Sequence, residues 1–387
     1  MAYELTETHR LIRDTARRIA RERVQPRAAQ IDEEGQYPDD IFAIFRQAGL
    51  LGLTIPAAYG GGGAGFLALA LVVEEIGKYC CSSGLVLVLG TLSTQPIIIG
   101  GSEEQKQSWL PRSAAGDIKG AFALTEPNAG SDPAAMESRA VRDGDEYVID
   151  GEKMFISGGN VADFVIVFAK TDPAAGARGV SAFIVPTDSP GFSVARLDHK
   201  MGVTGVPTAS LAFQGCRVPA ANLIGEEGRG FPTAMLTLAT CRPVVAARGL
   251  GLAEGALSYA LEFARERRAF GRPILEHQAI QFKLADMATQ IEAARHLVYH
   301  AAWLIDQGKY DRQYTAYFSF AKVFATEMAV QVSSDAMQIL GGQGYMKDHP
   351  LERHYRDARQ LMIVEGTSEI QRMIIAHALA EGDIAYG

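Results

Sequence analysis

Residues 122–132, with the sequence FALTEPNAGSD, join an apolar strand end to a loop of turn-forming and hydroxyl residues. The strand residues up to Leu124 keep the chain extended, whereas Pro127 fixes its own φ and Asn128 and Ser131 turn the chain. Backbone N–H groups in such a loop lack ladder partners, so they can donate hydrogen bonds to a ligand edge rich in acceptors. The segment is typical of a loop that holds a flat polar ring, although an ordinary strand-to-loop exit has a similar composition.

Three further segments carry residue types suited to chemistry. They are KMFIS at 153–157, ERRAFG at 266–271 and IVEGTS at 363–368. Together with residues 122–132, they resemble the signature segments of the acyl-CoA dehydrogenase family in both order and spacing. The resemblance covers essentially all 387 residues. It implies an FAD-dependent oxidoreductase that acts on acyl-CoA thioesters.

The resemblance implies that residues 122–131 and 155–157 line the isoalloxazine ring of FAD. This ring needs donors at its pyrimidine edge and near N5, because these positions gain negative charge when it accepts hydride. Thr125 and Ser157 can supply them, although a strand-end hydroxyl such as Ser157 is also common without a ligand. Phe155 stands where the family more often has Trp, so stacking is kept and the indole N–H is lost. The implied ring contacts are Phe122, Leu124, Thr125, Phe155, Ile156 and Ser157, and Ser131 is implied to lean toward the substrate.

Arg267, Arg268 and Arg272 form a cluster of forked donors that suits the pyrophosphate of FAD. Taken alone, arginines at a helix end are more often a solvated face. The resemblance instead implies that this region reaches the FAD of a neighbouring subunit, which predicts a homo-oligomer, a tetramer. The residues implied in this contact are Arg267, Phe270, Gln278, Gln338, Gly341 and Gly342. The last two glycines can equally be a helix cap.

Glu365 follows the apolar residues 361–364 and precedes Gly366, which allows the backbone to approach a substrate closely. The resemblance implies that Glu365 is the base that removes the α-proton, and desolvation in an apolar pocket strengthens a carboxylate base. The alternative is a glutamate that stabilises the dipole of the last helix. Arg242 matches an arginine near the catalytic glutamate, and Thr367 and Glu369 match further FAD contacts. Cys241 stands where some branched-chain members carry the base.

The implied reaction is α,β-dehydrogenation of a short- or medium-chain acyl-CoA, with branched chains included. Glu365 takes the α-proton, flavin N5 takes the β-hydride, and the electrons pass to an electron-transfer flavoprotein. Residues 155–158 most resemble the isobutyryl-CoA branch of the family, and the apolar stretch 84–89 is a candidate wall for the acyl chain. Two alternatives stay open: an acyl-CoA oxidase that uses oxygen, and a flavin-binding family member without turnover.

Hydrophobic periodicity predicts the elements that position these residues. We expect an all-α region first, with helices at 7–25 (ended by Pro26), 39–48, 67–79, 82–99 and 103–115. The glycine run 60–63 reads as a connecting loop, because no strand precedes it and no Lys-Ser/Thr follows. The Asp143-Gly144 turn then predicts a hairpin, followed by strands at 164–169, 180–185 and 210–213.

Long helices follow at 280–305, ended by Gly308, at 311–340 and at 370–379. Antiparallel long helices joined by short loops predict a four-helix bundle. The expected fold class is α+β and resembles that of the acyl-CoA dehydrogenases. It comprises an N-terminal all-α domain (1–116), a middle β-barrel-like domain (117–222) and a C-terminal helical bundle (223–387).

Composition restricts the partners. The chain has 37 Lys and Arg against 45 Asp and Glu, a net charge of −8, and no basic stripe. We therefore expect no nucleic-acid partner. No apolar run approaches the roughly 20 residues of a membrane span, since the stretch after Leu85 is interrupted at Gly90 and Pro96. The acidic start does not resemble a signal peptide. A cytoplasmic protein is predicted.

The four cysteines, Cys80, Cys81, Cys216 and Cys241, show no CxxC spacing. We expect reduced thiols and no metal site. A redox dithiol at the adjacent pair Cys80 and Cys81 is the alternative, although such a pair bridges to itself only with strain.

Overall fold

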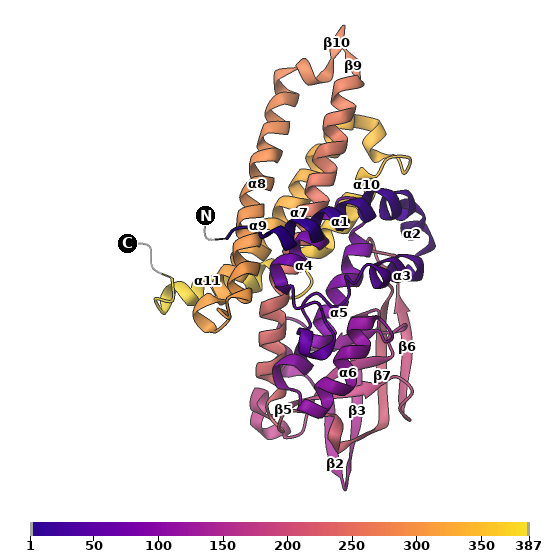
Figure 1. Cartoon of the computed structure of the whole chain (residues 1–387), viewed down its shortest axis with the longest axis vertical. Helices are drawn as coiled ribbons and strands as arrows, with labels where there is room; N and C mark the ends of the chain where they lie inside the picture. The colour runs from indigo at the N-terminus through magenta and orange to yellow at the C-terminus, as the bar shows by residue number, and fades with distance from the viewer. Residues whose placement is uncertain (1–2, 385–387) are drawn as a thin grey trace.

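The computed structural model describes residues 3–384. Helices come first, a sheet follows, and long helices complete the chain (Figure 1). The first region contains α1 (Glu7–Ile19), α2 (Ala28–Glu34), α3 (Asp39–Gln47), α4 (Gly65–Gly77), α5 (Cys81–Gly100) and α6 (Glu103–Ala115). Capping boxes begin α1 at Thr6 and α6 at Ser102, each with a reciprocal bond to the residue three positions on.

The middle region is an eight-stranded sheet, in which β1 pairs with β4 beside the main path β6-β7-β3-β2-β4-β5-β8. The strands are β1 (Gly120–Ala123), β2 (Arg139–Asp143), β3 (Glu146–Ser157), β4 (Phe164–Lys170), β5 (Val180–Pro186), β6 (Phe192–Asp198), β7 (Thr208–Pro219) and β8 (Leu223–Ile224). The predicted Asp-Gly hairpin joins β2 to β3, with Asp143 opposite Glu146.

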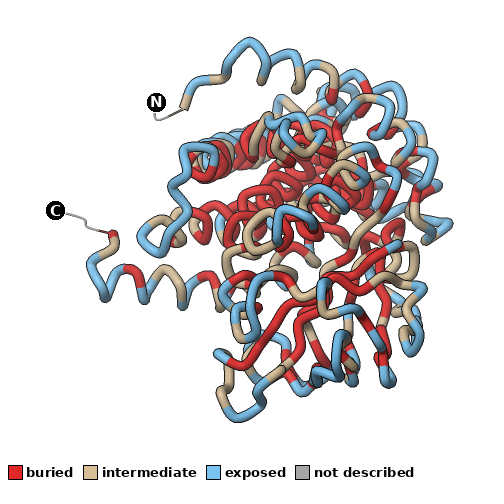
Figure 2. Tube along the Cα trace, turned by 60° about the horizontal axis from the view of Figure 1, so that its bottom comes forward, coloured by how far each residue is buried: buried red, intermediate tan, exposed pale blue. Residues whose placement is uncertain are grey.

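The third region contains α7 (Gly230–Glu266), α8 (Gln278–Asp306), α9 (Thr315–Leu340), α10 (Leu351–Leu361) and α11 (Ser368–Ala380). A small hairpin of β9 (Arg268–Ala269) and β10 (Arg272–Pro273) joins α7 to α8 at the end of the bundle away from the sheet (Figure 1). Buried residues run through the long helices and the strands, and α11 extends away from the body (Figure 2).

The α, sheet, α order of the predicted fold class is confirmed. Helices give way to strands between Ala115 and Gly120 and return between Ile224 and Gly230. The predicted domain limits 1–116, 117–222 and 223–387 stay predictions.

Pro26 does not end the first helical region, contrary to the prediction. The α-helix changes at Ala20 into a π turn and then into a 3-10 turn at Gln25–Arg27. Pro26 lies in the first positions of that turn, where no backbone N–H is needed. The chain therefore stays helical through α2, and Gly35 ends it with a φ of 60°.

Helix α5 runs through Pro96, in agreement with the helix predicted at 82–99. Contrary to the prediction that Gly90 and Pro96 interrupt the apolar stretch, the helix has the length and apolar composition of a membrane-spanning helix. Residues 81–100 are nevertheless packed inside the protein, with 78% of the most apolar window buried. This burial outweighs the local cost of the proline, so α5 is a core helix that contacts both α7 and β1.

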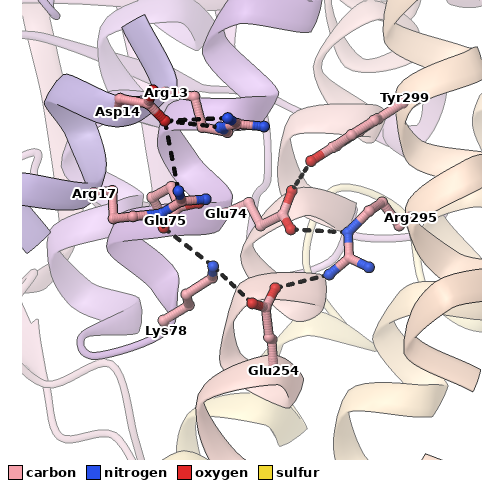
Figure 3. Close-up of polar contacts among 9 residues, drawn as sticks. All are labelled: Arg13, Asp14, Arg17, Glu74, Glu75, Lys78, Glu254, Arg295 and Tyr299. Carbon is pink, nitrogen blue, oxygen red and sulfur yellow. Dashed lines mark hydrogen bonds and ion pairs between the residues drawn. The ribbon is translucent and has the colours of Figure 1, made fainter. Parts of the chain in front are cut away.

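A network of buried charges joins the first region to the bundle (Figure 3). Arg295 on α8 donates to Glu74 on α4 over 3.2 Å and to Glu254 on α7 over 2.8 Å. Tyr299 also donates to Glu74, and burial raises the pKa of Glu74 to about 7 although Arg295 opposes that shift. Lys78 completes the network with a 2.7 Å ion pair to Glu254. Three separate helices are thus held by one guanidinium.

We predict that Arg295→Met destabilises the protein by about 3–5 kcal/mol, because it leaves Glu74 buried without its cation. Urea unfolding followed by circular dichroism measures this change. Arg217→Met is the matched control, since Arg217 pairs with Asp143 and Glu146 on the exposed surface. Equal unfolding midpoints for the two variants would contradict a structural role for the network.

Candidate active site

A buried ion pair fixes the loop that follows β1. Lys153 Nζ lies 2.6 Å from Glu126 Oε1 and also donates to the Leu124 carbonyl over 3.2 Å. Both side chains are almost fully buried, and Glu126 accepts hydrogen bonds from the Ser138 N–H. Burial opposes ionisation of Glu126, but the Lys153 cation outweighs it and lowers the pKa of that carboxyl. Because both charges are paired, the loop is attached firmly to β3.

This attachment gives the backbone of Thr125 a fixed direction. The Thr125 carbonyl accepts from the Met154 N–H over 2.8 Å, and the Thr125 N–H has no partner among residues 3–384. Phe122 packs on Phe168 within the sheet region, with their ring centroids 5.0 Å apart. A donor on the partly exposed Thr125, directly after the strand, is suited to the acceptor-rich edge of a flat ring.

Residues 155–157 divide between surface and core. Phe155 is 59% exposed and has a φ of 61°, which is rare for an aromatic residue. The side chains of Leu124 and Ile156 are buried in the core, so only their backbone atoms are free to meet a ligand. Ser157 is partly exposed at the end of β3, and Ser131 is exposed in the loop. The exposed ring of Phe155 is suited to stacking.

Glu365 lies in the turn between α10 and α11 and has a φ of 54°, a left-handed conformation for a residue with a Cβ. Lys322 on α9 donates to the Gly366 carbonyl over 2.7 Å, and Gln371 on α11 donates to the same atom over 3.0 Å. A Cβ on Gly366 would lie 2.7 Å from Gln371 Nε2. Thr367 caps α11 by accepting the Ile370 N–H. The turn is therefore held in its strained conformation from several sides.

The carboxyl group of Glu365 is desolvated. The residue is half-buried as a whole, but its Oε2 is buried and has no hydrogen-bond partner within the described part of the chain. Burial raises the pKa of Glu365 to about 7, and the cations of Arg248, Lys322 and Arg242 limit this rise. A carboxylate with a pKa near neutrality is suited to accept a proton and to release it.

Arg242 and Cys241 lie on α7 and are neighbours of the Glu365 carboxyl. Arg242 is only 6% exposed, and burial lowers its pKa to about 10 although Glu365 opposes that shift. Burial, and then Glu365, raises the pKa of the Cys241 thiol. All four cysteines are free and buried, as expected for reduced thiols. Glu369, by contrast, is exposed in the first turn of α11.

Sequence reasoning missed Arg248 and Lys322. Both are fully buried, and both approach Glu365 closely enough to influence its pKa. Each is a lone cation in an otherwise apolar helical stretch, PVVAARGLGLA at 243–253 and AYFSFAKVFA at 316–325. A single charge on an apolar helix face is a signal for a buried functional group, since lysine and arginine are almost never fully buried without a reason.

Helix α5 lies between the two parts of the site. In its first turn, a Cβ on Gly84 would lie 3.4 Å from Arg248 Cγ on α7. About one and a half turns later, Leu89 Cδ1 would lie 3.1 Å from a Cβ on Gly158, the residue after Ser157. The stretch 84–89 therefore runs from Arg248 to the end of β3.

The remaining predicted residues lie elsewhere. They gather at the β9–β10 end of the bundle, away from the sheet, and all are exposed: Arg267, Phe270, Gln278, Gln338, Gly341 and Gly342 (Figure 1). Lys283 on α8 pairs with Asp335 on α9 over 2.5 Å, which brings the start of one helix beside the end of the other. Phe270 is 95% exposed with a φ of 52°. Within one chain, these residues do not join the site around Glu365.

Models of protein families match this chain in three consecutive parts. The acyl-CoA dehydrogenase N-terminal domain matches residues 6–117, the middle domain matches 121–216, and the C-terminal domain matches 228–380.

Individual proteins match over nearly the full length. Cyclohex-1-ene-1-carbonyl-CoA dehydrogenase of Geobacter metallireducens is 45% identical over 376 residues, which cover 97% of this chain and 98% of that protein. Butyryl-CoA dehydrogenase of Megasphaera elsdenii has a TM-score of 0.95 at 39% identity, covering 98% of this chain and 100% of that one. A chain in a structure of the electron transferring flavoprotein of Acidaminococcus fermentans has a TM-score of 0.95 at 43% identity, with coverage of 98% and 99%.

We predict that Lys322→Met raises the pKa of Glu365 above its value near 7, because a neighbouring cation favours the ionised carboxylate. Infrared titration of the carboxyl band measures the pKa. The spectrum of Glu365→Gln is subtracted, so that only the band of Glu365 remains. Lys283→Met removes a lysine near the start of α8, at the β9–β10 end of the bundle, and should leave the titration of Glu365 unchanged. An unshifted pKa in Lys322→Met would show that Lys322 acts on the backbone turn alone.

Proposed function

This chain belongs to the acyl-CoA dehydrogenase family, whose members are FAD-dependent oxidoreductases, and on this premise we propose that it dehydrogenates short- to medium-chain acyl-CoA thioesters at the α,β position. The predicted family, enzyme class and FAD requirement are confirmed by the matches to family members. The substrate and the roles of individual residues are our proposals.

The observation that carries the proposal is the desolvated carboxyl of Glu365. Its Oε2 is buried without a partner among the described residues, and its pKa is raised to about 7. We assign to this oxygen the removal of the α-proton of the thioester. Arg248, Lys322 and Arg242 stabilise the ionised form before the transfer, and the turn held at Gly366 keeps the carboxyl directed at one place. A flexible or hydrated glutamate would be a weaker base.

FAD supplies the hydride acceptor when it is bound. The free N–H of Thr125 and the hydroxyl of Ser157 are suited to donate to its pyrimidine edge and to the region of N5, and Phe155 is suited to cover the ring. The backbone of residues 122–124 and 156 completes this surface. Thr367 and Glu369 at the start of α11 are proposed as further contacts, as are the residues at the β9–β10 end for a neighbouring subunit. Ser131 is proposed to meet the substrate.

The finer assignment is a short or branched acyl group, with electrons passed to an electron-transfer flavoprotein. The names of the similar proteins support a small acyl group, since they include a butyryl-CoA and a cyclic acyl-CoA dehydrogenase. Similarity to a chain in an electron transferring flavoprotein structure supports the acceptor. A tetramer and a cytoplasmic location stay predictions.

An anaerobic screen of CoA thioesters, read by loss of flavin absorbance, tests the proposed function directly. Reduction by a short acyl-CoA supports it, and no reduction by any thioester would leave only a flavin-binding protein without turnover. The oxidase alternative differs in its acceptor, so the same substrate in air would then produce hydrogen peroxide at the rate of turnover.

We predict that Glu365→Gln slows flavin reduction by roughly 10²–10⁴-fold, because it keeps the shape of the side chain and removes the base. Anaerobic stopped-flow spectroscopy measures the rate, and FAD content should be unchanged. The double variant Glu365→Gly with Cys241→Glu should recover part of the activity, since Cys241 lies beside the same carboxyl. Near-normal reduction in Glu365→Gln would eliminate Glu365 as the base.

We predict that Arg267→Ala weakens FAD binding by about 1.5–3 kcal/mol, the value of a hydrogen bond to a charged group. The reason is that the exposed Arg267 is proposed to meet the FAD of a neighbouring subunit. Titration of the apoprotein with FAD, combined with light scattering for the oligomeric state, measures both effects. The exposed Arg217 on the sheet provides the control Arg217→Ala, and equal FAD affinity in the two variants would refute the assignment.

A further inference from the structure

Arg248 is a fully buried guanidinium that makes hydrogen bonds only to neutral groups among the described residues. Its Nη2 donates to Gln360 Oε1 over 2.9 Å and to Cys81 Sγ over 3.3 Å, and its Nε is buried without a partner. A buried cation is expensive unless a carboxylate or another anion accompanies it. No carboxylate is hydrogen-bonded to Arg248 in residues 3–384. Its charge acts on Glu365, but that carboxyl is the proposed base, so the guanidinium keeps hydrogen-bonding capacity for a further anion.

The helix geometry places Arg248 in line with the proposed base. Cys241, Val245 and Arg248 are spaced i, i+4 and i+7, so they share one face of α7. The thiol of Cys241 lies beside Glu365, and Arg248 follows on the same face about two turns further along the helix, where its charge still opposes the rise that burial causes in the pKa of Glu365. The opposite wall is α5, where a Cβ on Gly84 would contact Arg248 Cγ at 3.4 Å. Arg248 thus lies where the far end of a short acyl chain would arrive.

A second cation, Lys200, lies near Arg248, since burial and then Arg248 lower its pKa to about 8 although Asp357 and Asp198 oppose that shift. The nearby carboxyl of Asp357 is already engaged by the Val203 N–H over 2.5 Å, and burial raises its pKa to about 6. Cys81, which Arg248 contacts, is the first residue of α5, so the positive end of the helix dipole is directed at the same place.

A second unsatisfied group lies on the same helix turn. Ser83 Oγ is fully buried, and no described residue is hydrogen-bonded to it. A hydroxyl and a guanidinium that are both buried and incompletely bonded form a donor set for one acceptor-rich group. The combination with the helix N-terminus favours an anion over a neutral acceptor.

We propose that Arg248 recognises a carboxylate at the far end of the acyl group, so that the preferred substrates are short ω-carboxyacyl-CoA thioesters. This inference rests on the proposed function. The carboxylate takes no part in bond making or breaking, and the α-proton still passes to Glu365. A long unsubstituted chain is disfavoured, because its terminal methyl and methylene groups would have to lie against a bare guanidinium and would leave it unpaired.

Arg248 also holds the side chain of Gln360. The backbone carbonyl of Gln360 accepts the N–H groups of Ile363 and Val364, just before Glu365. A role limited to this support requires a hydrogen-bond donor and not a charge. Loss of support would slow the reaction of every substrate by the same factor, whereas loss of carboxylate recognition would change the ratio between substrates. The ratio therefore separates the two roles.

The test compares glutaryl-CoA with pentanoyl-CoA, and adipyl-CoA with hexanoyl-CoA, by kcat/KM for flavin reduction under anaerobic conditions. The wild type should prefer each ω-carboxyl compound by roughly 10- to 100-fold, the range of a charged hydrogen bond. Arg248→Met should abolish this preference, Arg248→Lys should retain part of it, and Arg217→Met should leave it unchanged. An equal loss for both members of each pair in Arg248→Met would overturn the proposal.

The wild-type ratio tests the inference even if Arg248→Met does not fold. A wild type that reduces its flavin with pentanoyl-CoA at least as efficiently as with glutaryl-CoA would refute carboxylate recognition and leave the proposed function standing. A wild type that responds to no thioester of either class would refute both.

Discussion

The desolvation of one carboxyl group is the constraint on which the rest of the site depends. Glu365 is withdrawn from water in a left-handed turn that costs of the order of 1–3 kcal/mol. The turn persists because Lys322 and Gln371 bind the Gly366 carbonyl and Thr367 caps α11. These anchors come from different helices, so α9 and α11 must be packed before the carboxyl is positioned. Burial then raises the pKa of Glu365 to about 7, which only a fixed, dry environment can maintain.

A chain that buries so many charges has to pair them, and it does so in distinct ways. Lys153 and Glu126 form a close pair that fixes a loop, and Arg295 binds two carboxylates that join α4, α7 and α8. These groups are satisfied within the chain, so their role is structural. Arg248 differs, because the described residues offer it no hydrogen-bonded carboxylate. Buried cations that are paired within the chain therefore support the fold, whereas Arg248, which lacks such a pair, is proposed to bind a ligand.

Exposed aromatic residues mark the other surfaces that the fold leaves incomplete. Phe155 and Phe270 both have positive φ and are largely exposed, and they belong to different regions, β3 of the sheet and the β9–β10 hairpin. A strained backbone that directs an apolar ring into solvent is typical of a site that meets something outside the chain. The residues around Phe155 and those around Phe270 are therefore proposed to serve separate contacts in one protomer, with a neighbouring subunit bringing the two together.

The sequence by itself determined the family, the order of helices and strands, and the segment containing Glu365, because these depend on local motifs and periodicity. It failed where tertiary packing overrides local preference. Pro26 does not end its helical region, since the helix changes from α to π to 3-10 geometry before it and the proline lies where no backbone N–H is needed. Helix α10 was missed because the face it buries includes Arg353, His354 and Asp357, which apolar periodicity does not detect. The sequence contains Arg248 and Lys322 but cannot say that they meet Glu365. Only the packing of α7, α9 and the turn before α11 decides which charges share the same dry space, and that sharing sets their chemistry.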